Sequence, residues 1–195
     1  KSSFDIPVTF MGYQIPPAKH DDIQALVVLN SILSGGESSR LSQRLVRKDK
    51  IALFSAGQPI TRQGPGLFFY FAVYFPHIKP AKIESTIIDE LEKIKKDGVT
   101  EQELTKAQKQ LLAAKIFERY SASSLANSLG SAQMTYGDYR EYETEIERFS
   151  KVSSEDIKRV ANTYFIDKNL LVMHISPENI GFGKKLMMRL ASLFM

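Results

Sequence analysis

The sequence predicts an α+β fold in which helices pack on one face of a sheet. Segments with the composition of β-strands alternate with segments whose apolar residues recur at helical spacing, in the order strand, two helices, two strands, several helices, strand. The two adjacent strands can pair as a hairpin, so a purely parallel sheet is not expected. No Pro-, Gly- or Ser-rich linker divides the chain. We therefore expect one domain over residues 1–180, followed by a basic amphipathic tail over residues 181–195.

The N-terminal part predicts a strand and two helices. Residues 8–15 are rich in β-branched and aromatic side chains and are followed by two prolines. The first helix begins near Asp21-Asp22, where negative charge complements the helix dipole. It ends at Ser34-Gly35-Gly36, because glycine adopts the left-handed conformation of a helix C-terminus at little cost. Ser38 is then placed to cap a second, shorter helix.

Residues 51–60 and 66–76 predict two neighbouring strands, connected by residues 61–65. The second of these strands is the most hydrophobic segment of the chain. Its alternation gives two apolar rows, Leu67, Phe69, Phe71, Val73 and Phe75 on one face and Phe68, Tyr70, Ala72 and Tyr74 on the other.

The C-terminal part predicts a series of helices and a closing strand. Thr100 with Glu103, and Ser153 with Asp156, have the spacing of capping boxes at helix N-termini. Apolar residues at helical spacing and helix-end signals predict helices over residues 83–97, 100–114, 121–136, 142–149 and 153–164. The closing strand is expected over residues 169–176.

The composition excludes several classes of protein. With 43% hydrophobic and 25% charged residues, the chain is an ordinary globular one and neither disordered nor of low complexity. The net charge of +4 is spread along the chain, without the dense basic patch of a nucleic-acid-binding protein. The absence of cysteine excludes disulfides, thiol nucleophiles and Cys-ligated zinc. Localisation stays open, because reducing and oxidising compartments both accept cysteine-free domains.

The two ends of the sequence carry separate expectations. The chain begins with Lys1 and a stretch without the apolar region of a signal peptide, so we expect a piece of a longer polypeptide. The longest apolar run, residues 67–75, is much shorter than the about 20 residues of a membrane-spanning helix. The basic and apolar residues 184–195 favour a helix docked on this domain or its partner, with a membrane-surface helix as the alternative.

The sequence assigns no catalytic residue and no metal ligand to this chain. His20, His77 and His174 are scattered over a loop, a strand end and a strand, and neither HExxH nor HxxEH occurs. The GxSxG elbow, the GxxxxGK phosphate loop and GxGxxG are also absent. A hydrolase that uses Ser38 and a histidine such as His20 is retained as a weak alternative.

Several segments, taken in order, resemble one peptidase family. They are the helix end Leu29-Asn30-Ser31-Ile32-Leu33-Ser34-Gly35-Gly36, then Ser38-Ser39-Arg40-Leu41 and the basic stretch of residues 45–52, and downstream Gly98-Val99-Thr100-Glu101-Gln102-Glu103-Leu104 and Val152-Ser153-Ser154-Glu155-Asp156-Ile157. Over roughly residues 8–176, the chain resembles the C-terminal, non-catalytic domain of the M16 (pitrilysin-like, mitochondrial-processing-peptidase-like) zinc metallopeptidases.

The resemblance implies a LuxS/MPP-like metallohydrolase fold and a role as the non-catalytic half of a zinc endopeptidase. Active members pair two homologous halves around a closed chamber, and the N-terminal half carries HxxEH with a distal Glu. The zinc is thus expected in the partner half, on the same polypeptide or on a separate subunit, and no cofactor is expected in this chain. The expected partners are that catalytic half and a peptide substrate. A scaffold subunit of an M16-like complex without peptidase activity is the alternative.

The second of the two central strands is the candidate substrate-binding segment. In some relatives an Arg and a Tyr on this strand grip the peptide backbone, but here Phe68 stands at the Arg position and Phe75 lies near the Tyr position. The row that contains Phe68, Tyr70 and Tyr74 is aromatic where a solvated face would be polar. We therefore predict that Phe68, Tyr70 and Tyr74 bind substrate. Burial of both faces by the domain or by a partner half is an equal alternative.

Overall fold

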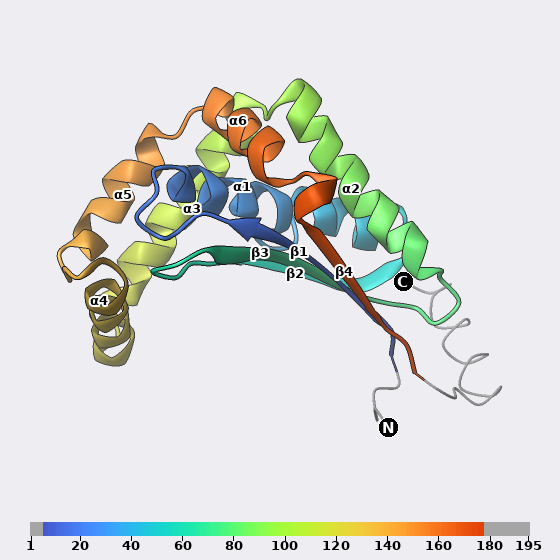
Figure 1. The fold of residues 1–195 in the computed structure, drawn as a ribbon, viewed down its shortest axis with the longest axis horizontal. Helices are drawn as coiled ribbons and strands as arrows, with labels where there is room; N and C mark the ends of the chain where they lie inside the picture. The colour runs from blue at the N-terminus through green and yellow to red at the C-terminus, as the bar shows by residue number, and fades with distance from the viewer. Residues whose placement is uncertain (1–5, 178–195) are drawn as a thin grey trace.

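The computed structural model describes residues 6–177, which form one sheet with helices over one of its faces (Figure 1). In chain order the elements are β1 (Val8–Ile15), α1 (Asp22–Ser34), the π-helix η1 (Ser42–Lys48), β2 (Ala52–Ile60), β3 (Gly66–Tyr74), α2 (Pro80–Asp97), α3 (Glu101–Glu118), α4 (Ala122–Tyr136), α5 (Glu141–Lys151), α6 (Ser154–Tyr164), the short 3₁₀ helix η2 (Asp167–Asn169) and β4 (Leu170–Ile175). The predicted α+β fold with helices on one sheet face is confirmed.

The four strands pair in the order β2-β3-β1-β4, and every pair is antiparallel. β2 and β3 form the predicted hairpin. β1, the first strand in the sequence, lies inside the sheet between β3 and the last strand, β4, which forms one edge of the described sheet. Gly12 of β1 is opposite Phe69 on one side and Leu171 on the other.

The helix boundaries follow the local signals of the sequence. Both predicted capping boxes are present, with Thr100 and Ser153 each accepting a hydrogen bond from the backbone N–H three residues later. α2 and α4 end at Gly98 and Gly137, whose φ angles of 77° and 80° lie in the region that only glycine adopts without strain.

The core fills the space between the sheet and its helices. α1 contributes most of its length, and α2 and α6 each add one apolar stripe. In Figure 1 these three helices lie over the sheet, while α4 and α5 lie at one end of it. The buried side chains of the sheet that meet them are Thr9, Met11, Tyr13, Ile15, Phe68, Tyr70, Ala72 and Tyr74.

One predicted cap is wrong. Ser38 does not cap the second helix, because η1 begins only at Ser42 and its first turn has no side-chain cap. The hydroxyl of Ser38 instead accepts a hydrogen bond from Lys106 of α3.

The predicted boundary near residue 180 and the tail over residues 181–195 lie outside the described residues, so both stay predictions. Within residues 6–177, no helix combines the length and the apolar character that a membrane crossing requires.

Candidate functional site

The sheet face opposite the helices is the candidate functional surface, because it is apolar and no described helix covers it (Figure 1). We call it the open face. Its largest exposed side chains come from three strands and retain 39–69% of their accessible surface: Phe54 of β2, Leu67 of β3, and Leu171 and Met173 of β4. Exposed apolar patches of this kind mark surfaces that contact another molecule.

Aromatic rings form the middle of the open face. Phe10 and Phe71 stack with their centroids 5.6 Å apart, and Phe54 lies 5.7 Å from Phe71 at a tilt of 52°. Phe69 lies 6.3 Å from Phe71 along the same strand. Three strands therefore contribute to one aromatic cluster, at separations typical of favourable ring pairs.

The structure places the predicted substrate-binding residues on the opposite face. Phe68, Tyr70 and Tyr74 have no exposed surface and lie beneath the helices, so the predicted assignment of the two faces of β3 is reversed. Phe165, at the end of α6, packs edge-on against Phe68 at 5.0 Å. Desolvation raises the pKa of Tyr70 well above its ordinary value, as expected for a core phenol. As placed, these side chains cannot reach a peptide on the open face.

The three histidines lie apart and contact different partners. His20 lies beside Asp22 at the start of α1, and His77 stacks on Phe75 after β3. His174 of β4 lies within hydrogen-bond distance of Thr9 and 3.4 Å from Glu84. Across residues 6–177, no group of three or more His, Cys, Asp or Glu side chains is arranged to hold a metal ion.

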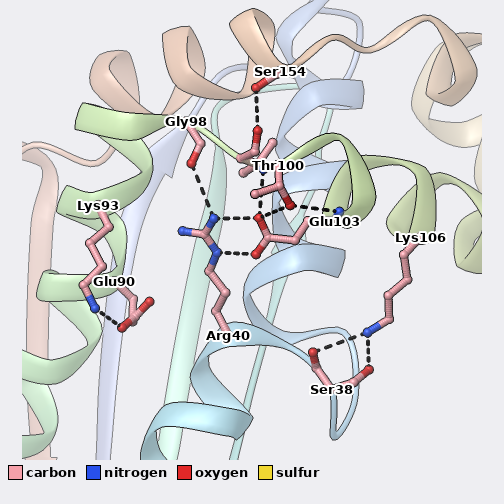
Figure 2. A network of polar contacts seen from close by, with 10 residues as sticks. Ser38, Arg40, Glu90, Lys93, Gly98, Thr100, Glu103, Lys106 and Ser154 are labelled. Carbon is pink, nitrogen blue, oxygen red and sulfur yellow. Dashed lines mark hydrogen bonds and ion pairs between the residues drawn. The ribbon is translucent and has the colours of Figure 1, made fainter.

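A polar network fastens the loop after α1 to the α2–α3 turn (Figure 2). Arg40 makes two hydrogen bonds to the carboxylate of Glu103, at 2.6 and 2.8 Å, and a longer one to the carbonyl of Gly98. Glu103 also accepts from the backbone N–H of Thr100. The hydrogen bonds from Arg40 are the main cause that lowers the pKa of Glu103 to about 2. This bidentate pair is structural, since it joins the loop after α1 to the α2–α3 turn.

Ser38 and Lys106 lie at the edge of the same network (Figure 2). Lys106 also contacts the carbonyl of Ser38. His20, which the weak hydrolase alternative would need as a base, contacts Asp22 at the start of α1 instead. The described contacts therefore bring no histidine to Ser38.

A second polar cluster joins α1 to α6. Asp22 accepts hydrogen bonds of 2.6 Å from both Arg159 and Tyr164, and its side chain is only 8% exposed. Burial alone would raise the pKa of Asp22, but the hydrogen bonds from Tyr164 and Arg159 outweigh it, and the pKa lies below its ordinary value. Asp22, which lies at the predicted helix start, thus joins the two core helices α1 and α6.

These features define the class: an α+β domain with one helix-covered and one apolar, open sheet face. A family model described as the peptidase M16 inactive domain matches residues 2–111. The chain therefore belongs to the peptidase M16 family and matches its inactive domain.

Individual relatives agree with the family. Zinc protease PqqE of Helicobacter pylori is 30% identical over 167 residues, which cover 86% of this chain and 37% of that protein. The uncharacterized zinc protease YmxG of Bacillus subtilis is 26% identical and covers 86% of this chain and 40% of that protein. The chain spans 30–40% of the length of the curated relatives that it matches.

Solved structures share the fold. A protease from Helicobacter pylori has a TM-score of 0.84 at 29% identity, covering 91% of this chain and 42% of that chain. An inactive peptidase domain of a zinc protease from Bordetella parapertussis has a TM-score of 0.81 at 23% identity, covering 93% of this chain and 96% of that chain.

Sequence reasoning missed the residues of the open face, although one signal could have identified them. Gln14 of β1 is opposite Leu67, and Gln58 of β2 is opposite Phe69. A polar residue in an otherwise apolar strand marks the side away from the core. With the strand pairing known, both glutamines assign Leu67 and Phe69 to the open face.

Proposed function

We propose that this chain is the non-catalytic half of an M16-type zinc metalloendopeptidase. In this role it closes the proteolytic chamber opposite the half that binds zinc, and it contacts an extended peptide substrate. The single observation that carries the proposal, beside membership of the family, is the apolar open face of the sheet.

Burial of the open face by a partner would be energetically favourable. Burying apolar surface contributes about 25 cal/mol per Å². Phe54, Leu171 and Met173 each expose at least half of their accessible surface, so a partner gains free energy by covering them. The chain spans less than half of its curated relatives, which leaves room in a whole protein for a catalytic half.

Peptide contact belongs, in this proposal, to Phe54 and Phe71 rather than to Phe68, Tyr70 and Tyr74. Phe54 and Phe71 lie on neighbouring strands of the open face, with ring centroids 5.7 Å apart. An extended peptide places alternate side chains on one side, and neighbouring aromatic rings offer them a flat apolar surface. Within residues 6–177, β2 pairs only with β3, so its other side would be the place for backbone pairing with such a peptide.

The test uses the full-length polypeptide, with its catalytic half, and a fluorogenic peptide substrate. We expect Phe54→Ser to lower kcat/KM by about tenfold, which is the loss of about 1.4 kcal/mol of apolar contact. Zinc content should stay unchanged. Phe117→Ser is the matched control, because Phe117 is 69% exposed on α3.

Equal effects of Phe54→Ser and Phe117→Ser would contradict a role of the open face in the reaction. A full-length protein that binds zinc but cleaves no peptide in a broad library would favour the scaffold alternative.

A further inference from the structure

A polar pocket of about 290 Å³ lies on the helix side of the molecule, away from the open face. It is bordered by the loop before α1, the end of α5 and the start of α6. Its lining includes Lys19, Gln24, Arg148, Lys151 and Arg159. The volume is near the lower end of the range for ligand pockets, about 300–1,000 Å³, and therefore suits a short segment better than a large cofactor.

Gln24 gives the first indication of a ligand. Gln24 is 9% exposed, and its buried Oε1 atom accepts no hydrogen bond from any residue between 6 and 177. A buried acceptor without a donor destabilises the folded chain, whereas an apolar side chain of the same shape would not. Natural proteins keep such unfavourable groups mainly at functional sites. Among the three side chains of this kind within residues 6–177, Gln24 is the one that lines this pocket.

The charges around Gln24 give the second indication. Four cationic side chains line the pocket, against the two carboxylates of Asp21 and Asp156. Arg159 forms ion pairs with Asp22 at 2.6 Å and with Asp156 at 3.3 Å, and these two contacts fix its position in the pocket lining.

Two of the other cations, Lys151 and Arg148, form ion pairs that a ligand could replace. Lys151 pairs with Glu147 while both side chains remain about 70% exposed, and Arg148 pairs with Glu141 at 42% and 31% exposure. Exposed pairs of this kind contribute little to stability and are easily exchanged. The pocket thus combines an unpaired acceptor, Gln24 Oε1, with cationic side chains that can pair with an anion.

We propose that this pocket binds the C-terminal end of a peptide. The terminal carboxylate would pair with Lys19, Arg148 and Lys151, and the backbone N–H beside it would donate to Gln24 Oε1. A free peptide C-terminus supplies an anion for the cationic side chains and a neutral N–H donor for Gln24 Oε1, side by side. This inference concerns a site distinct from the open face and does not depend on the proposed function.

The binding test uses the 195-residue chain, since solved chains of similar extent show that such a domain is a folding unit. Acetyl-trialanine with a free carboxylate, the same peptide with an amidated C-terminus, and inorganic phosphate are titrated into ¹⁵N-labelled protein. We expect the free acid to shift the Gln24 side-chain amide and the Lys19 backbone signals, and to bind at least about tenfold more tightly than the amide. Equal binding of acid and amide, or phosphate binding as tightly as the acid, would overturn the proposal.

Gln24→Met tests the orphaned acceptor directly. We expect it to weaken binding of the free acid about tenfold while raising Tm by about 2–4 °C, because it removes the unsatisfied oxygen. Gln43→Met on η1 is the control and should change neither quantity. Lys19→Ala supplies an independent check at an exposed position, with several-fold weaker binding at unchanged Tm. Unchanged affinity in both pocket variants would exclude this binding mode.

Discussion

Phe10 of β1 stacks on Phe71 of β3, with ring centroids 5.6 Å apart, on the face of the sheet that carries no described helix. The contact joins two central strands on the side away from the core. Such a cluster stabilises the sheet only modestly while it is open to water, and it gains most when another surface covers it. The two faces of β3 should therefore respond very differently to substitution.

The first prediction compares these two faces. Phe68→Ala removes a ring with no exposed surface and should lower the free energy of unfolding of the isolated chain by about 3–5 kcal/mol. Phe54→Ser, at a ring that is 54% exposed, should lower it by less than about 1 kcal/mol. Urea unfolding followed by circular dichroism measures both. Comparable losses would mean that the open face is part of the domain's own core.

The second prediction concerns the Arg40–Glu103 pair. The pKa of Glu103 is about 2 in the folded chain, below its ordinary value of 4.5. A lowered pKa means that the ionised form stabilises the fold above pH 4.5, and that this contribution is lost as the pH falls from 4.5 toward 2. Glu103→Gln should therefore lower the free energy of unfolding by about 1 kcal/mol at pH 7, and its difference from the unsubstituted chain should shrink through that window.

Unfolding curves at pH 7, 4 and 3 check this dependence. Gln at this helix position can still serve the capping box, so the variant isolates the ion pair. Glu101→Gln, two residues earlier and exposed, is the control and should change stability by less than about 0.5 kcal/mol at every pH. A Glu103→Gln difference that is constant with pH would refute the role of the ionised pair.

The third prediction compares the effects of two glycine-to-alanine substitutions on stability. A Cβ on Gly57 would lie 2.5 Å from Cδ1 of Tyr70 and 2.7 Å from the carbonyl oxygen of Phe69, so Gly57→Ala should cost about 1–3 kcal/mol. A Cβ on Gly130, inside α4, would meet no atom of the described residues within 4 Å, and Gly130→Ala should stabilise the fold by about 0.5–1 kcal/mol. Thermal unfolding of both variants measures the signs, and two changes of the same sign would contradict the packing described.

Much of the fold could be predicted because its signals are local. Thr100 with Glu103, and Ser153 with Asp156, fix two helix starts through hydrogen bonds within one turn. Gly137 marks the end of α4 by its own backbone geometry. Such signals need no knowledge of the rest of the chain.

The candidate site could not be predicted in the same way, because it depends on contacts between distant segments. Both rows of β3 are apolar, so alternation separates the faces without telling which one the helices cover. The pairing of Gln14 with Leu67 decides it, and that pairing joins strands more than fifty residues apart. The prediction for Ser38 was also wrong, and its hydroxyl accepts a hydrogen bond from Lys106, a contact between segments distant in the sequence.

The most direct test asks whether this chain is the non-catalytic half of a zinc endopeptidase. It measures zinc content and peptide cleavage together, for this chain and for the full-length polypeptide. Elemental analysis of the purified chain should find no stoichiometric zinc, and the chain alone should cleave no peptide. The full-length protein should bind one zinc per polypeptide and cleave, with the metal bound by its other half. One zinc per chain together with peptide cleavage by the 195 residues alone would contradict the account.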